Sequence, residues 1–225
     1  MKTKKTNAIV LRKVPYKENS IILTLFSEKE GLLSLFVKHT GKKHAAIFNP
    51  LSEAEFVYRS KNTEQYFFVD ASIIDLHLSL RNSLDSLETA SKMVKHILKT
   101  QLPGKPAPRL YLLFSLYLKK IPDIKDPNLL LISFVLKALY HDGQLDLSDI
   151  CSKCSEKAIG LFQGESFCLK DLPHLGLRFS EEEWKTLQKL LTMKSFDELN
   201  FHSNNLLNEK FSKLICLPWD WLQFR

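Results

Sequence analysis

The spacing of apolar residues changes near residue 78, and this change constrains the fold of the 225-residue chain more than any other feature. Before it, short runs such as residues 54–60 (AEFVYRS) alternate between two sides, which is the pattern of a half-buried strand. After it, apolar residues recur at the spacing of one helix face, at Leu80, Leu84, Leu87, Val94 and Leu98. The sequence therefore predicts an α+β fold in which strands come first and helices follow.

Five β-rich runs lie at the start of the chain. They are separated by turn-rich segments and cover residues 7–13, 20–28, 32–39, 54–60 and 64–74. Segment 27–31 (SEKEG) ends in Gly31, which can adopt the positive φ that a tight turn needs. Five short strands in so short a stretch suit a small closed β-barrel of the OB type. We therefore expect an OB-fold nucleic-acid-binding domain over residues 1–78.

Helical runs follow at residues 78–100, 109–121, 128–143 and 179–193. The proline-rich segment 101–108 ends the first run, and Ser180 with Glu183 has the spacing of a capping box before the last. The tail, residues 204–225, predicts one more short helix and an aromatic end. We expect an α-helical domain over residues 79–225.

The chain contains no segment that we expect to span a membrane. Its longest apolar stretch, residues 129–140, is broken by Ser133 and Lys137, and the apolar run near the start is too short for a signal peptide. Four cysteines, two of them in a C-x-x-C pair, indicate a reducing compartment rather than a disulfide framework. These features predict a soluble, cytoplasmic protein.

Basic charge is concentrated at the start of the chain. Residues 1–60 hold eleven Lys and Arg against five Glu, within a net charge of +7 for the whole chain. Such an imbalance suggests a polyanionic partner, most often nucleic acid, although it also fits a solvated lysine-rich surface. The densest cluster is the loop 37–48 (VKHTGKKHAAIF), and the predicted DNA-binding residues are Arg12, Lys13, Lys38, Lys42, Lys43 and Arg59.

Aromatic residues are interleaved with these cations, at Phe36, Phe48, Tyr58, Tyr66 and Phe68. Barrels that bind single strands use exposed rings as platforms on which unpaired bases stack. The alternative is that each ring simply belongs to the barrel core. Both interpretations stay open at the level of the sequence.

Residues 151–171 (CSKCSEKAIGLFQGESFCLKD) begin like a zinc-binding knuckle. Cys151, Cys154 and Cys168 have the spacing of three thiolate ligands, and Asp171 stands where a fourth cysteine belongs. His174 is the alternative fourth ligand. The segment predicts either a structural zinc site or a degenerate knuckle held by packing alone, within an insertion at about residues 149–175.

The sequence lacks the common catalytic signatures. It contains no G-x-G-x-x-G fingerprint, no H-E-x-x-H metal motif and no G-x-S-x-G nucleophile elbow. Residues 41–43 (GKK) are similar to the end of a phosphate-binding loop, but Phe36 stands where that loop needs glycine. We expect a protein that is not an enzyme. The alternatives are a zinc-dependent nucleic-acid enzyme and an interaction scaffold that does not bind DNA.

Three parts of the chain, in this order, carry a family resemblance: residues 8–43, residues 49–58 (NPLSEAEFVY) and the interrupted cysteine pairs. Through them the chain resembles the RecO family of bacterial recombination mediators. The resemblance implies an OB barrel, a helical domain and a zinc-finger-like insertion. It also implies binding of single- and double-stranded DNA, annealing of complementary strands, and association with the nucleoid. With RecR, and in some cases RecF, such proteins help RecA replace the single-strand-binding protein SSB at gaps.

The resemblance further implies contact with the acidic, Phe-ended C-terminal tail of SSB. That contact needs an apolar pocket for the Phe and a cation for its carboxylate, and the candidate cations are Arg81, Arg109 and Lys119. The loop lysines would form part of the DNA surface. His39 replaces a glycine that is frequent in the family, which predicts a stiffer loop, and Asp171 replaces the fourth cysteine.

Overall fold

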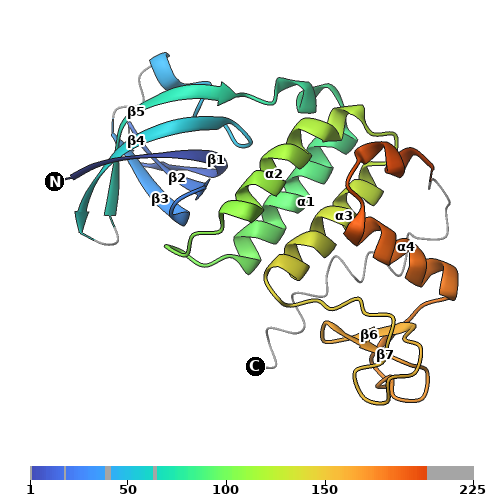
Figure 1. Cartoon of the computed structure of the whole chain (residues 1–225). Helices are drawn as coiled ribbons and strands as arrows, with labels where there is room; N and C mark the ends of the chain where they lie inside the picture. Colours follow the sequence, from blue (N-terminus) through green and yellow to red (C-terminus); the bar gives the residue numbers. More distant parts are fainter. Residues whose placement is uncertain (1, 18, 39–41, 63–64, 202–225) are drawn as a thin grey trace. The chain divides into compact units, whose positions relative to one another are not determined.

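The computed structural model describes residues 2–17, 19–38, 42–62 and 65–201. The chain divides into two compact units, Met1–Pro122 and Asp123–Arg225. The first unit holds five strands and two helices, and the second holds two further helices with a small sheet (Figure 1). A domain boundary at residue 78 stays a prediction, and the first unit includes the two helices that follow it.

The first unit contains a closed five-stranded barrel. Its strands are β1 (Lys2–Tyr16), β2 (Ser20–Ser27), β3 (Gly31–Lys38), β4 (Glu53–Asn62) and β5 (Gln65–Asp75). They pair in the order β1-β2-β3-β5-β4, and the closure between β4 and β1 is antiparallel. The pairing of β3 with β5 is parallel, with Leu35 opposite Tyr66 and Phe36 opposite Phe67. The predicted OB-type barrel is thus confirmed.

The period of two decides which side chains fill the barrel. On β2, for example, Ile21, Leu23 and Leu25 are buried in the core, while Ile22 and Thr24 between them are only partly buried. The other strands contribute in the same way, and the core cluster consists of Ala8, Val10, Ile21, Leu23, Leu25, Leu33, Leu35, Val37, Ile47, Phe48, Ala54, Phe56 and Tyr58.

Two helices, α1 (Leu84–Thr100) and α2 (Pro108–Lys120), complete the first unit. Ile9 and Phe26 oppose each other in the register of β1 and β2, and both are fully buried although they lie outside the barrel core cluster. The Phe26 ring lies 6.2 Å from the Tyr111 ring and 6.4 Å from the Phe114 ring of α2, measured between centroids. This part of the outer wall of the barrel is therefore covered by α2.

A buried carboxylate ties α2 to the barrel. Glu53, at the start of β4, is only 4% exposed. It accepts hydrogen bonds from the hydroxyl groups of Tyr111 at 2.6 Å and Ser115 at 2.8 Å, and Lys119 Nζ lies 3.7 Å away. Since a buried charge needs such partners, these contacts fix where the helix lies on the barrel.

Gly31 allows the loop between α1 and α2 to approach the start of β3. Its φ is +67°, as the predicted turn requires, and a Cβ built there would lie 2.0 Å from the carbonyl oxygen of Lys105. The Gly104 N–H donates to the Leu32 carbonyl at 3.0 Å. Any larger residue at position 31 would have to displace this loop.

The prediction of a single helix over residues 78–100 is wrong in one respect. A short 3-10 helix, η2 (Leu78–Asn82), precedes α1, and the extended Ser83 between them caps α1 by accepting from the Ser86 N–H. A serine at this position satisfies a free N–H group of the first turn, so the helix begins after it. Leu84 is 79% exposed and does not belong to the predicted apolar face.

The second unit packs helix α3 (Pro127–His141) against α4 (Glu181–Thr192). Ser133 on α3 donates to the Leu190 carbonyl at 2.8 Å, and the capping box predicted at Ser180 is present. In the sequence between α3 and α4 lie β6 (Gly160–Phe162), β7 (Glu165–Phe167) and β8 (Leu177–Arg178), and η4 (Phe196–Phe201) follows α4. The short helix η3 (Ile121–Asp123) spans the division between the two units. The tail predicted to form a last short helix lies outside the described residues.

Among the residues that the structure describes, no helix combines the length and the apolar character that crossing a membrane would require.

The contact between Glu53 and α2 can be tested with Tyr111→Phe, which removes the donating hydroxyl and keeps the ring. A hydrogen bond to a charged group contributes about 1.5–3 kcal/mol, so we expect a loss of this size in the free energy of unfolding, measured by urea denaturation. Tyr140→Phe is the matched control, because Tyr140 is 56% exposed. Equal stability of the two variants would contradict the role of Glu53.

Candidate nucleic-acid interface, metal centre and pocket

Three of the predicted DNA-binding residues lie on the outward side of the barrel strands. Arg12 opposes Thr24, Lys38 follows the outward Phe36 by two residues, and Arg59 opposes Phe67. All three cations are exposed. We call this part of the outer wall the open face, and its members are Arg12, Tyr16, Phe36, Lys38, Arg59 and Phe67.

The other predicted cations stand apart from the open face or are only partly described. Lys13 opposes Leu23, a residue of the barrel core, and therefore belongs to the opposite side of β1 from Arg12. The backbone of Lys42 lies in the 3-10 helix η1 (Lys42–His44), and its side chain lies outside the described part of the chain. His39 lies outside it as well, so the expected stiffness of the loop stays a prediction.

Lys43 and His44 are held by an acidic residue of β5. Asp70 Oδ1 lies 2.8 Å from His44 Nε2 and 3.5 Å from Lys43 Nζ. The Ala71 N–H, His44 and Lys43 all stabilise the carboxylate and lower the pKa of Asp70 below its ordinary value. The basic loop therefore carries an internal counter-charge, which reduces what Lys43 offers to a phosphate.

Most of the predicted stacking rings belong to the core. Phe48 and Tyr58 are 2% and 1% exposed, and Tyr66 and Phe68 pack against the core cluster. For Phe48 and Tyr58 the stacking interpretation is wrong, because inward positions of a small barrel are filled by side chains. Of the five rings, Phe36 alone belongs to the open face.

Three residues of this region were missed in the sequence. Tyr16 and Phe67 join Phe36 on the open face, and Lys17 Nζ lies 5.6 Å from the centroid of the Tyr16 ring. Alternation from Arg12 through Val14 could have placed Tyr16 beside Arg12. No pattern in the sequence predicts that Phe67 lies beside Phe36, because this neighbourhood results from the pairing of β3 with β5.

Three cysteines of the second unit, Cys151, Cys154 and Cys168, converge with Asp171. A tight hairpin of β6 and β7 turns at Gln163 and Gly164, both with positive φ, and leads the chain back to Cys168. Cys168 Sγ lies 3.5 Å from Cys154 Sγ and 3.4 Å from Asp171 Oδ2. Cys151 Sγ lies 3.5 Å from the same carboxylate oxygen, and all four ligand atoms are within 4.8 Å of one another.

This donor set fits a tetrahedral metal ion. Ligand atoms around zinc, with Zn–S near 2.3 Å and Zn–O near 2.0 Å, lie about 3.5–3.8 Å apart, close to the separations found here. Hydrogen bonding to the Asp171 carboxylate raises the pKa of the Cys154 thiol to about 12. Three thiolates and one carboxylate so close together repel one another, and a bound cation would offset this repulsion. His174, the alternative ligand, is exposed and does not belong to the group.

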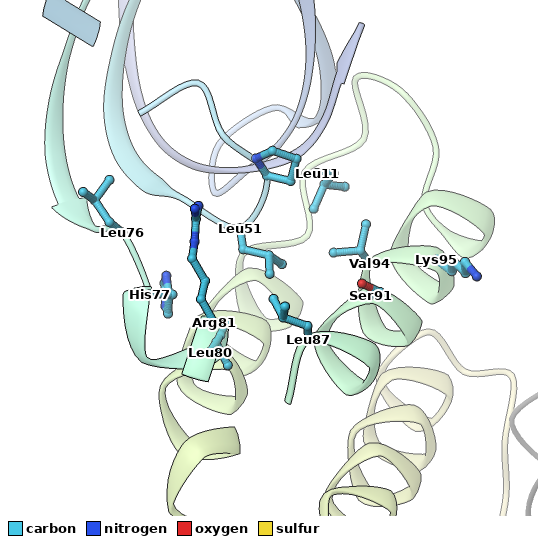
Figure 2. Close-up of a pocket in the computed structure, with 11 residues that line it drawn as sticks. Leu11, Leu51, Leu76, His77, Leu80, Arg81, Leu87, Ser91, Val94 and Lys95 are labelled. Atoms are coloured by element: carbon cyan, nitrogen blue, oxygen red, sulfur yellow. The ribbon is translucent and has the colours of Figure 1, made fainter. Parts of the chain in front are cut away.

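A pocket of about 540 Å³ lies in the first unit where η2 and α1 meet the barrel (Figure 2). Its walls are mostly apolar, and Arg81 and Lys95 are the two cations among the lining residues. Figure 2 shows Arg81 and Leu87 directed towards Leu51. The lining residues are Leu11, Pro50, Leu51, Leu76, His77, Leu80, Arg81, Leu87, Ser91, Val94 and Lys95.

Two lining residues of this pocket have unusual conformations. Leu51 and His77 both have positive φ, at +73° and +45°, which is strained for residues with a side chain. His77 is 4% exposed, neither ring nitrogen makes a hydrogen bond within the described structure, and burial lowers the pKa of the imidazole. Of the three candidate cations for the tail of SSB, Arg81 lines this pocket, whereas Arg109 and Lys119 do not.

The chain combines an OB-type barrel with helices and with a cysteine-rich segment, residues 151–171, which we call the finger. This combination places it among OB-fold proteins with a cysteine-rich insertion. Residues 1–77 match the family model described as "Recombination protein O N terminal". The chain belongs to the RecO family of DNA repair and recombination proteins.

The relatives named DNA repair protein RecO cover most of the chain. The protein of Chlamydia trachomatis serovar L2 is 32% identical over 199 residues, which are 85% of this chain and 81% of the relative. The protein of Chlamydia pneumoniae is 28% identical over 197 residues, covering 85% and 78%. The protein of Thermoanaerobacter sp. is 27% identical over 163 residues, covering 70% and 64%.

Proposed function

We propose that this chain is a non-catalytic recombination mediator that binds single- and double-stranded DNA on the open face of its barrel. Within the described residues, no carboxylate pairs with Arg12, Lys38 or Arg59, which are exposed on the outward side of β1, β3 and β4. This observation carries the proposal, because unpaired cations are available to phosphates. Each phosphate that a cation neutralises releases counterions, which drives binding without regard to sequence.

The same electrostatics favour annealing. Two complementary strands repel each other through their phosphates, and a cationic surface that holds both of them lowers this repulsion. In the proposal the chain anneals such strands and, with RecR and in some settings RecF, helps load RecA onto single strands covered by SSB. Membership of the RecO family supports the choice of these partners, and in the proposal the barrel supplies the DNA contact.

The charge contribution is tested with Arg12→Glu combined with Arg59→Glu. Losing two contacts to a single strand should lower affinity and reduce the slope of log K against log salt by about 1.4. The measurement is a titration of labelled oligonucleotide at several salt concentrations. Lys185→Glu with Lys189→Glu on α4 is the matched control, since both lysines are exposed and the change in charge is the same. Equal losses in the two variants would exclude the open face as the DNA surface.

We also propose that Cys151, Cys154, Cys168 and Asp171 hold a structural zinc ion. Zinc is suited to a tetrahedron of thiolates with one carboxylate, and it would join Cys151 and Cys154 at the start of the segment to Cys168 and Asp171 at its end. All four positions are supplied by the protein, which leaves no open position for substrate. This favours a structural role over the alternative of a zinc-dependent nucleic-acid enzyme.

The zinc proposal predicts one zinc ion per chain in protein purified without chelator, measured by elemental analysis. Asp171→Ala should weaken zinc retention against a competing chelator, and Cys151→Ser should in addition lower the unfolding midpoint of the second unit, because metal affinity contributes to folding. His174→Ala is the control and should retain the metal. Protein that carries no zinc, or that loses zinc only in the His174 variant, would contradict the assignment.

A second binding function is favoured by the pocket at Arg81. We propose that it takes the C-terminal tail of SSB, with the terminal Phe against the apolar walls and the carboxylate beside Arg81. This proposal is supported by three features of the pocket: its apolar lining, the cation Arg81 and the strained backbone of Leu51 and His77. Lys119 is already paired with Glu53, which makes it the weakest of the three candidates.

This proposal predicts that an acidic peptide ending in Phe binds the protein and that Arg81→Glu weakens binding by about tenfold or more, the size of a lost charge-assisted hydrogen bond. Fluorescence anisotropy of the labelled peptide gives the affinity. Arg109→Glu is the matched control, and a peptide with an amidated C-terminus tests the carboxylate. A stronger effect of Arg109→Glu would move the site away from the pocket.

A further inference from the structure

Three aromatic rings form a continuous strip on the open face. The centroid of the Phe36 ring lies 5.5 Å from that of Tyr16 and 5.9 Å from that of Phe67, and both contacts are edge-to-face at 84° and 85°. The rings come from the end of β1, from β3 and from β5; β3 pairs with β5, and β2 lies between β1 and β3. We call this set the ring strip.

The core does not account for the ring strip. Its three residues do not belong to the barrel core cluster; Tyr16 is 42% exposed, and Phe36 and Phe67 are partly buried. Phe26 also lies outside that cluster, but it is fully buried against α2. Adjoining aromatic rings that stay at least partly exposed on an outer wall mark an interaction surface.

Each ring of the strip has a cation beside it. Lys17 lies over the Tyr16 ring, Lys38 stands two residues beyond Phe36 on the same side of β3, and Arg59 opposes Phe67. A single nucleic-acid strand alternates bases with phosphates, so alternating rings and cations match its chemistry. A duplex presents phosphates but keeps the faces of its bases stacked inside.

We infer that Tyr16, Phe36 and Phe67 form a stacking platform for unpaired nucleobases and give this chain its preference for single strands over duplex. The inference rests on the proposed DNA-binding function and deepens it. The cations bind the phosphates of either form of DNA, whereas the rings can stack only on bases that are free to leave the base stack of the DNA. Because every base has an aromatic face, the preference is independent of sequence.

The test uses full-length protein with Tyr16→Leu combined with Phe67→Leu, which removes two rings, keeps apolar side chains and leaves Phe36 in place. A labelled single strand and a duplex of equal length are titrated at one salt concentration. We expect single-strand affinity to fall at least about fivefold and duplex affinity to change less than twofold. Tyr16→Phe with Phe67→Tyr retains both rings and should behave as the unmodified protein.

A second readout detects stacking directly. A single strand that contains 2-aminopurine should lose fluorescence when it binds the unmodified protein, and the double Leu variant should quench it less. Equal losses for single strand and duplex, or unchanged single-strand affinity and quenching, would overturn the inference and leave the strip to a protein partner. Failure of the unmodified protein to bind either DNA would instead contradict the proposed function itself.

Discussion

The parallel pairing of β3 with β5 is the contact on which the candidate DNA surface depends. It closes the barrel and leaves neither strand with a free edge on that side. It also sets Phe67 beside Phe36, and because β5 pairs with β4 on its other side, it sets Arg59 beside Phe67. Residues more than thirty positions apart thus become neighbours on one wall.

The helices then decide how much of the outer wall stays accessible. Phe26 and Phe36 both lie outside the barrel core, but the first is covered by α2 and the second is not. The position of α2 is set by the buried Glu53 carboxylate and by Gly31, which lets the preceding loop come close. One carboxylate and one glycine therefore help to determine which part of the outer wall α2 covers and which part stays exposed.

In the finger, the sequence predicted part of the candidate metal site and the fold decided the rest. The spacing of Cys151, Cys154 and Cys168 predicted either a structural zinc site or a degenerate knuckle, because C-x-x-C followed by a distant thiol is the spacing of zinc ligands. The choice between Asp171 and His174 was open until the fold brought the carboxylate to within hydrogen-bonding distance of two thiols. In the same way, the charges of the basic loop were visible in sequence, but not the Asp70 carboxylate that offsets Lys43.

The sequence by itself determined the order of elements, the barrel type, the capping of α4 and the three thiols of the candidate metal site, because each of these follows from a local period or spacing. It misplaced the start of α1 and left all five predicted rings, Phe48 and Tyr58 included, open between the barrel core and a stacking surface. Only the tertiary structure decided that Tyr16, Phe36 and Phe67 adjoin and that Arg81 lines a pocket. The physical reason is that strand register and helix docking are set by contacts between distant residues, which leave no periodic trace in the chain.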